Sequence, residues 1–171
     1  MKLTISVLLA MASAIALGQQ PSKPAADGLS GLSFMQGNWS GQQDFNTTSG
    51  AKMIGDATDN ISVCIKEKYI CEMLSTTLPN RKPTDTRHFI SFDKQTGKYT
   101  AWWFNDTSVR PMELTGEVAG NELVLLSDAS APGPVLRATY ELTPENKLTF
   151  LLEMKQGDSW VKLFLTTYSK K

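Results

Sequence analysis

Short runs of alternating apolar and polar residues follow one another along most of the chain, and clusters of Gly, Asn, Asp and Pro separate them. Alternation with a period of two is typical of a strand with one buried face, and the separating residues favour turns. No long window after Phe34 has a helical period. The pattern therefore predicts strands over residues 38–46, 52–65, 69–78, 85–93, 98–105, 111–118, 121–127, 135–142, 147–155 and 159–168.

The alternation also predicts how neighbouring strands pair. In the eighth and ninth predicted strands, pairing Leu142 with Leu148 places Tyr140 opposite Phe150. The two apolar faces then coincide, as register selection requires. The sixth and seventh predicted strands pair their apolar faces in the same way. The last strand is less clear, because its apolar residues lie on both faces: Val161, Leu163 and Leu165 on one, Trp160 and Phe164 on the other.

A series of neighbouring hairpins leaves two unpaired edges unless the sheet closes on itself. We therefore predict an all-β fold, an antiparallel up-and-down β-barrel of about ten strands, in preference to a sandwich. A barrel of this size encloses a lumen that side chains fill or that holds a small ligand. Before the first strand, residues 29–37 (LSGLSFMQG) can form one short helical turn.

The composition excludes several classes of function but does not identify one. The chain has 171 residues, 17 Lys plus Arg, 17 Asp plus Glu, one His and two Cys. This length supplies one globular core. Zero net charge argues against a broad nucleic-acid-binding surface, which needs clustered excess Lys and Arg. So few His and Cys residues exclude a zinc finger or an iron–sulfur site, and we expect no metal.

The N-terminal residues predict export. Lys2 is followed by an apolar run from Leu3 to Leu17, which is shorter than the roughly 20 residues that span a bilayer. A small residue at Ala16 and another at Gly18 fit a signal peptidase site. We expect a signal peptide over 1–18, a disordered leader over 19–28 and one barrel domain over 29–171. The mature chain is then periplasmic or secreted, with no membrane span.

The start of the first strand carries Gly37-Asn38-Trp39-Ser40-Gly41. It resembles the opening of the calycin, or lipocalin-like, barrels, whose first strand bears a Gly-x-Trp signature. More closely, the chain resembles a bacterial family of secreted lipocalin-like domains of unknown function, through LSFMQGNWSG, FISFDKQTGKYTAWWFND, LTGEVAGNELVL and WVKLFLTTYSKK. That resemblance implies a barrel of about ten strands and no assigned activity. For Gly37, Trp39 and Gly41 we expect a structural role, a ring that plugs one end beside close backbones.

The same opening is also distantly similar to nitrobindin-type barrels, which carry Gly-x-Trp-x-Gly-x-Gly and bind haem through a His near the C-terminal end. Gln43 stands where that pattern has its last Gly, and residues 135–171 contain no His. We therefore expect no haem and no other cofactor.

His88 is the only imidazole, and alternation places it on one face with Ile90 and Phe92. If Phe92 pairs with Tyr99 across the next turn, His88 lies opposite Trp103. Alternation similarly places Glu72 between Ile70 and Leu74. If that face is the lumen, Glu72 is a buried carboxylate that needs a partner, and His88 or Arg87 can provide it. A core His bonded to a neighbour is the simpler alternative to a ligand or catalytic role.

Cys64 and Cys71 flank the segment IKEKYI. A hairpin closed around this segment, with a loop over residues 66–69, places the two cysteines opposite each other on one face. Disulfides form in the oxidising compartments that exported proteins reach. We therefore predict a cross-strand disulfide, the alternative being two separate buried thiols.

These observations support three hypotheses. The first is a barrel that binds a small apolar or amphipathic molecule in its lumen, because inward aromatic side chains with few polar groups are typical of ligand sites. Its expected contacts are His88, Tyr99, Trp103, Glu72, Tyr140 and Phe150. The second is a small isomerase or hydrolase that uses His88 and Glu72. The third is an interaction module with a filled core and an exposed apolar patch that includes Trp102, Phe104 or Trp160.

Overall fold

The protein is described from a computed structural model, which defines residues 28–46, 52–106 and 108–171. The predicted signal peptide and all of the predicted leader except Gly28 lie outside these residues. No helix among the described residues is both long enough and apolar enough to cross a membrane.

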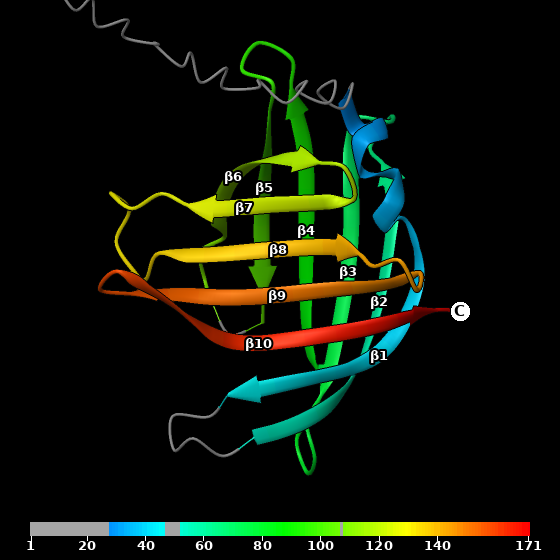
Figure 1. Ribbon diagram of the computed structural model, residues 1–171, viewed down its shortest axis with the longest axis vertical. Coiled ribbons are helices and arrows are strands. Elements are labelled where there is room, and N and C mark those ends of the chain that lie inside the picture. The colour runs from blue at the N-terminus through cyan, green and yellow to red at the C-terminus, as the bar shows by residue number, and fades with distance from the viewer. Residues whose placement is uncertain (1–27, 47–51, 107) are drawn as a thin grey trace, which may run out of the picture.

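Ten antiparallel strands close into one barrel (Figure 1), which confirms the predicted fold class. Each strand pairs with its neighbours in the sequence, and β1 pairs with β10 to complete the closure. Every predicted strand exists, and no predicted boundary is more than two residues from the one in the structure. The strands are β1 (Gly37–Asn46), β2 (Lys52–Cys64), β3 (Tyr69–Thr77), β4 (Thr84–Asp93), β5 (Lys98–Asn105), β6 (Met112–Ala119), β7 (Glu122–Ser127), β8 (Leu136–Leu142), β9 (Lys147–Gln156) and β10 (Ser159–Lys170).

A short 3-10 helix, η1 (Gly28–Met35), precedes β1 and covers the barrel end at which β1 begins. Its Leu32 and Met35 side chains have no exposed surface. The Trp39 indole nitrogen donates to the Met35 carbonyl oxygen at 2.8 Å, and the Tyr99 hydroxyl donates to the Gly28 carbonyl oxygen at 2.7 Å. We call this the capped end. The opposite end, where β1 ends and β2 begins, is called the mouth.

Two glycines allow neighbouring strands to approach more closely than other residues permit. A Cβ atom added to Gly41 would lie 1.9 Å from the Thr167 carbonyl oxygen of β10, and one added to Gly116 would lie 1.8 Å from the Val124 carbonyl oxygen of β7. Any side chain there would collide with backbone. Gly41 and Gly116 therefore set the close approach at these two points of the barrel wall.

The predicted register of β8 and β9 is confirmed, with Leu142 opposite Leu148 and Tyr140 opposite Phe150. In β10, whose inward face the alternation left open, the inward residues change from one set to the other along the strand. The register of β10 with β9 shifts between Lys162 and Phe164. A bulge adds one residue and reverses the alternation beyond it, so the inward residues after the bulge are Phe164, Thr166 and Tyr168.

The predicted disulfide between Cys64 and Cys71 is present, with 5.9 Å between the Cα atoms. The two cysteines are diagonal neighbours, and the expectation that they lie directly opposite was wrong. Cys64 pairs with Tyr69, and Cys71 pairs with Ser62. The turn begins one residue earlier than expected, at Ile65, because residues 65–67 all adopt left-handed backbone angles and already belong to the loop.

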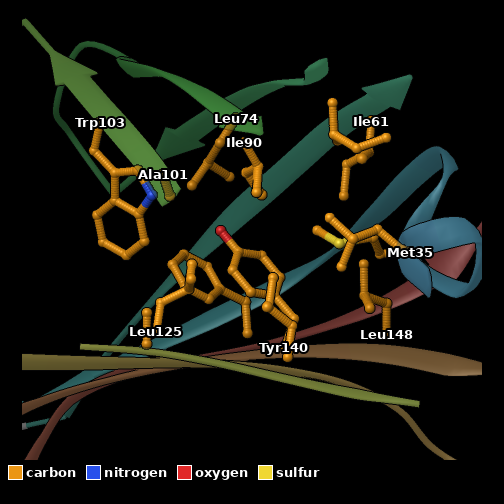
Figure 2. Packing of buried hydrophobic residues seen from close by; sticks show 14 of the residues in the cluster. Met35, Ile61, Leu74, Ile90, Ala101, Trp103, Leu125, Tyr140 and Leu148 are labelled. Atoms are coloured by element: carbon orange, nitrogen blue, oxygen red, sulfur yellow. The ribbon is translucent and has the colours of Figure 1, made fainter. Parts of the chain in front are cut away.

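Side chains from all parts of the wall meet inside the barrel (Figure 2), and the largest buried ones are aromatic. In this view Trp103 lies far from Met35, which belongs to the capped end, and the Tyr140 hydroxyl points between the walls. The core therefore occupies the lumen, and any polar group within it must find its partner among the other lumen residues.

Candidate functional site

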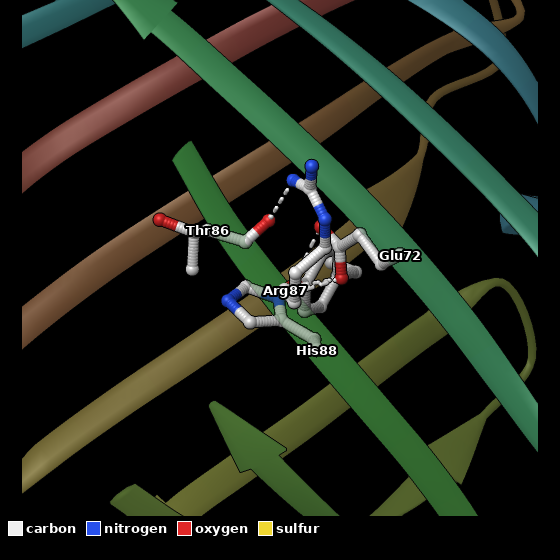
Figure 3. Close-up of polar contacts among 5 residues, drawn as sticks. Glu72, Thr86, Arg87 and His88 are labelled. Atoms are coloured by element: carbon white, nitrogen blue, oxygen red, sulfur yellow. Dashed lines mark hydrogen bonds and ion pairs between the residues drawn. The ribbon is translucent and has the colours of Figure 1, made fainter. Parts of the chain in front are cut away.

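Three consecutive strands bring the predicted polar pair and its aromatic neighbour together. Glu72 of β3 lies opposite His88 of β4, and His88 lies opposite Trp103 of β5. Arg87 is not the partner of Glu72, because its side chain is on the exposed face of β4. Its Nη1 donates to the Thr86 carbonyl oxygen at 3.1 Å (Figure 3). The Glu72 and His88 side chains are 0% and 1% exposed, so both are buried in the lumen.

A triangle of hydrogen-bonding groups fixes this pair. His88 Nδ1 lies 2.7 Å from Glu72 Oε2 and 3.1 Å from the Tyr140 hydroxyl oxygen. The Tyr140 hydroxyl, which reaches across the lumen from β8, donates to Glu72 Oε2 at 2.9 Å. When Glu72 is ionised it accepts from both partners, and His88 then carries its proton on Nδ1. We call Glu72, His88 and Tyr140 the bonded half of a buried polar centre.

The other half of this centre consists of Asp59, Thr166 and Tyr168, from β2 and β10. Asp59 is 3% exposed, and Thr166 and Tyr168 have no exposed surface. Neither Asp59 carboxyl oxygen, nor the Thr166 or Tyr168 hydroxyl, has a hydrogen bond of normal geometry within the described part of the chain. An unsatisfied buried polar group costs about 1–3 kcal/mol. We call these three residues the unbonded half.

Burial controls the charge of the polar centre. It raises the pKa of Glu72 to about 7, against the hydrogen bonds that favour the carboxylate. Burial, and next the adjacent Glu72 carboxylate, raise the pKa of Asp59 to about 10. Burial lowers the pKa of His88 to about 3. Near pH 7 Asp59 is therefore protonated and His88 neutral, so the centre holds at most the one negative charge of Glu72.

Aromatic rings surround the bonded half. The Trp103 indole stacks on the His88 ring, with 4.3 Å between centroids and 19° between planes. The Phe150 ring meets the edge of His88 at 6.2 Å and stacks on Tyr140 at 4.4 Å. These contacts fix the orientation of His88 on two sides. The Trp103 indole nitrogen is also buried without a hydrogen-bond partner in the described residues.

Exposure of the inward side chains falls from the mouth towards the polar centre. At the mouth, apolar residues such as Phe45, Met53, Met112, Met154 and Phe164 are half-buried. Deeper in the barrel the exposed fractions are 9% for Leu152, 8% for Thr76 and 6% for Trp103, against 1% for His88. Trp103 lies two residues before the end of β5 at the mouth. It therefore forms part of a floor between the mouth and His88.

The structure gathers most, but not all, of the predicted site residues. His88, Glu72, Trp103, Tyr140 and Phe150 are in mutual contact through the bonds and ring contacts above. Tyr99 faces inward but lies at the capped end, where it bonds to η1. The residues of the unbonded half were not predicted. For Asp59 a signal existed, because alternation places it on one face with Ala57 and Ile61.

The outer wall of β3, β4 and β5 carries an apolar patch. Phe104 is 44% and Met73 is 47% exposed. Ring contacts join Phe104 to Phe89 at 5.8 Å, and Trp102 to Tyr69 at 6.3 Å. Trp160, the third residue expected in such a patch, lies elsewhere and stacks under the Arg137 guanidinium at 4.5 Å. The patch thus contains two of the three expected residues.

These features define a class: a closed ten-stranded antiparallel barrel, capped at one end, with a polar centre buried in its lumen. The chain belongs to the family described as "Protein of unknown function (DUF1579)", whose model matches residues 30–170. Among solved structures, the crystal structure of Rv2717c from M. tuberculosis is similar, with a TM-score of 0.63 and 13% identity over 84% of this chain and 96% of that one. At this identity the likeness concerns the fold alone. No curated protein matches the chain.

The donor set of the centre does not form a metal site. Within residues 28–46, 52–106 and 108–171, no three His, Cys, Asp or Glu side chains are placed to hold a metal ion. The chemistry that the centre offers is that of hydrogen bonding and proton binding, through two carboxyl groups, one imidazole and two phenols.

Proposed function

We propose that this barrel binds a small apolar or amphipathic molecule that enters at the mouth. The observation that carries the proposal is the decrease in exposure from the half-buried apolar residues of the mouth to Trp103 and Leu152. Apolar walls that converge on a few polar groups are typical of small-molecule sites. The ligand first meets Trp103, Leu152 and Thr76. His88, Glu72, Tyr140 and Phe150 lie behind this floor, and Tyr99 is too far towards the capped end.

The flexible residues at the mouth suit this role. Three of the half-buried side chains there are methionines, at positions 53, 112 and 154. Methionine side chains are unbranched and polarizable, so they adapt to ligands of different shape. The floor residues Leu152, Thr76 and Trp103 are at most 9% exposed in this conformation, so a ligand must displace side chains of the floor to reach the polar centre.

A catalytic role has less support. His88 and Glu72 meet the geometric condition for acid–base chemistry, since Nδ1 lies 2.7 Å from Oε2. Both side chains are covered, however, and Trp103 stacks on the imidazole. A substrate would have to move Trp103 before it reached either group. We therefore propose binding, with His88 and Glu72 as groups that position Trp103 and Tyr140.

Intrinsic fluorescence tests this proposal, because Trp103 forms the floor. We expect a set of lipids and small metabolites to include ligands that change the emission and add their mass to the protein in native mass spectrometry. The emission change should disappear in Trp103→Phe and persist in Trp102→Phe, its outward neighbour on the same strand. If no compound of the set gives either signal, the lumen is only a core and the proposal is wrong.

Export is part of the same proposal. The apolar run at the start of the sequence and the disulfide between Cys64 and Cys71 support it. Mass spectrometry of the protein purified from its native cells tests it: we expect a chain that begins at Gln19. A chain that retains the first 18 residues would contradict export through a cleaved signal.

A further inference from the structure

The two halves of the polar centre differ in a way that suggests what a ligand would supply. In the bonded half, Glu72, His88 and Tyr140 satisfy one another. In the unbonded half, four polar atoms make no hydrogen bond of normal geometry among the described residues, although Asp59 lies beside Glu72 and Tyr168 beside Thr166: both carboxyl oxygens of Asp59 and the hydroxyls of Thr166 and Tyr168. These three side chains are at least 97% buried. Buried groups without a well-formed hydrogen bond call for an explanation, such as a bound partner or a functional role.

The charges around the unbonded half select among ligand head groups. Among the residues that the structure describes, the buried charged and polar ones are Gln43, Asp59, Glu72, Thr76, His88 and Thr166, and they include no Lys or Arg. A carboxylate or phosphate head would meet two carboxyl groups and no cation, which is unfavourable in a medium of low dielectric constant. An ammonium head would instead find Asp59, Glu72 and several hydroxyl acceptors.

We propose that the unbonded half is the subsite for the head group of an amphipathic amine, a ligand with an apolar body and one basic nitrogen. This inference rests on the proposed function and names the ligand class. The ammonium group would donate to Asp59 and to the Thr166 and Tyr168 oxygens, and the apolar body would extend towards Trp103, Leu152 and the methionines of the mouth. An ammonium has three donors, which matches these three partners.

When the amine binds, its ammonium group replaces the proton on the Asp59 carboxyl group. Free, the barrel holds Asp59 as a neutral carboxylic acid; bound, the ammonium pairs with the Asp59 carboxylate, and the carboxyl proton leaves to solvent. The titratable groups that face Asp59 are Glu72 from β3, His88 from β4, Tyr140 from β8 and Tyr168 from β10. On β1 the residue opposite Asp59 is Trp39, which does not titrate. Only Glu72 among them changes charge between pH 6 and 8. Affinity for the amine should therefore rise with pH.

Three probes with one chain length test the ligand class: n-octylamine, 1-octanol and octanoate, each titrated at pH 6, 7 and 8 by calorimetry. The amine stays protonated over this range, like a Lys side chain. We expect octylamine to bind most tightly and its Kd to fall up to about tenfold per pH unit, as one released proton requires. The Kd of octanol should not change, and octanoate should bind most weakly.

Two matched variants test the role of Asp59. In Asp59→Asn the amine should lose most of its preference over octanol, and the decrease of its Kd with pH should shrink to the part that ionisation of Glu72 contributes. Asp56→Asn removes a carboxylate from the exposed face of the same strand and should change neither. If octanol or octanoate binds the wild-type protein as tightly as the amine, or if Asp59→Asn keeps the full pH dependence of the wild type, the amine subsite is wrong although the barrel still binds ligands. If none of the three binds and the larger set of compounds also fails, the proposed function itself is wrong.

Discussion

The capped end and the mouth are formed by the same ten strands but are completed differently. At the capped end, Leu32 and Met35 of η1 fill the opening and have no exposed surface, and two side-chain hydrogen bonds hold the helix. At the mouth, Met53, Met112 and Phe164 remain half-buried, and no described helix covers them. The difference separates two tasks: stability is concentrated at one end, and access to the lumen at the other. Changes at the two ends should therefore have separable effects.

The largest effect is expected from truncating the cap. Leu32→Ala removes a fully buried side chain and should lower the free energy of unfolding by about 2–5 kcal/mol, measured by urea denaturation. Met112→Ala removes a half-buried side chain at the mouth and should cost less than about 1.5 kcal/mol. Ser33→Ala, an exposed position of η1, serves as the control. Equal losses for Leu32→Ala and Met112→Ala would contradict the division between the two ends.

The disulfide belongs to the capped end, because it joins β2 and β3 beside the turn that connects them. The double variant Cys64→Ala/Cys71→Ala should lose about 2–3 kcal/mol, the chain-entropy contribution of a short loop. The same measurement on wild-type protein with a reductant should give a similar loss. Ligand binding at the mouth should be unchanged, and a lost emission response to ligand would show that the two ends are coupled.

The next effect concerns pH. Asp59 has a pKa of about 10 in the folded protein, whereas an unfolded Asp ionises near 4. Between these values the folded state holds a proton that the unfolded state has released, so stability falls as pH rises. Glu72 and His88 titrate below pH 8 in the folded state. From pH 8 to 9.5 wild-type stability should fall by up to about 1.4 kcal/mol per pH unit relative to Asp59→Asn.

Urea unfolding of both proteins at several pH values measures this difference, with Asp56→Asn as the matched control. Asp59→Asn should be the more stable protein at the upper end of the range, since its side chain has no proton to lose. Stabilisation on removing a polar group is typical of functional sites. Parallel pH curves for wild type and Asp59→Asn would contradict a buried, protonated Asp59.

The smallest effect is local and concerns the floor of the mouth. Since the chain has one His, proton NMR follows His88 through a single imidazole Hε1 signal. Burial keeps its pKa far below the usual range, so between pH 5 and 8 the wild-type signal should show only the smaller shift that ionisation of the adjacent Glu72 causes. Trp103→Ala opens the floor to water, and the pKa of His88 should move upward. Trp102→Ala, on the outer face, should leave the signal unchanged, and a similar shift in both variants would show general loosening.

Much of the fold followed from the local pattern, because strand and turn signals are local properties of the chain. The pairing of His88 with Trp103 followed from the same alternation, as did the burial of Glu72. The contact of Tyr140 with Glu72 did not, because these residues lie on β8 and β3, which pair with other strands and meet only across the lumen. Strand register predicts contacts between adjacent strands but not contacts between strands that meet across the lumen.

The residues of the unbonded half were not predicted from the sequence for a different reason. Asp59 lies in the polar run DATDN, where the inward residues are small or acidic and the face is easily taken for solvent-exposed. Thr166 and Tyr168 follow the bulge at Lys162 and Phe164, which reverses the alternation of β10. One inserted residue thus places in the lumen two polar side chains that an unbroken alternation from Val161 would place outside.

The closure of β1 on β10 has a consequence for how the chain is made. These strands lie at opposite ends of the domain sequence, and the contact is completed by the Lys171 amide, which donates to the Asn38 carbonyl oxygen at 2.9 Å. Whether the chain emerges from the ribosome or, as proposed above, across a membrane, β1 comes first and cannot find its second partner until β10 follows. Through that interval β1 has one open edge, as does the newest strand. Such edges recruit other strands, so the nascent barrel depends on rapid completion or on a chaperone.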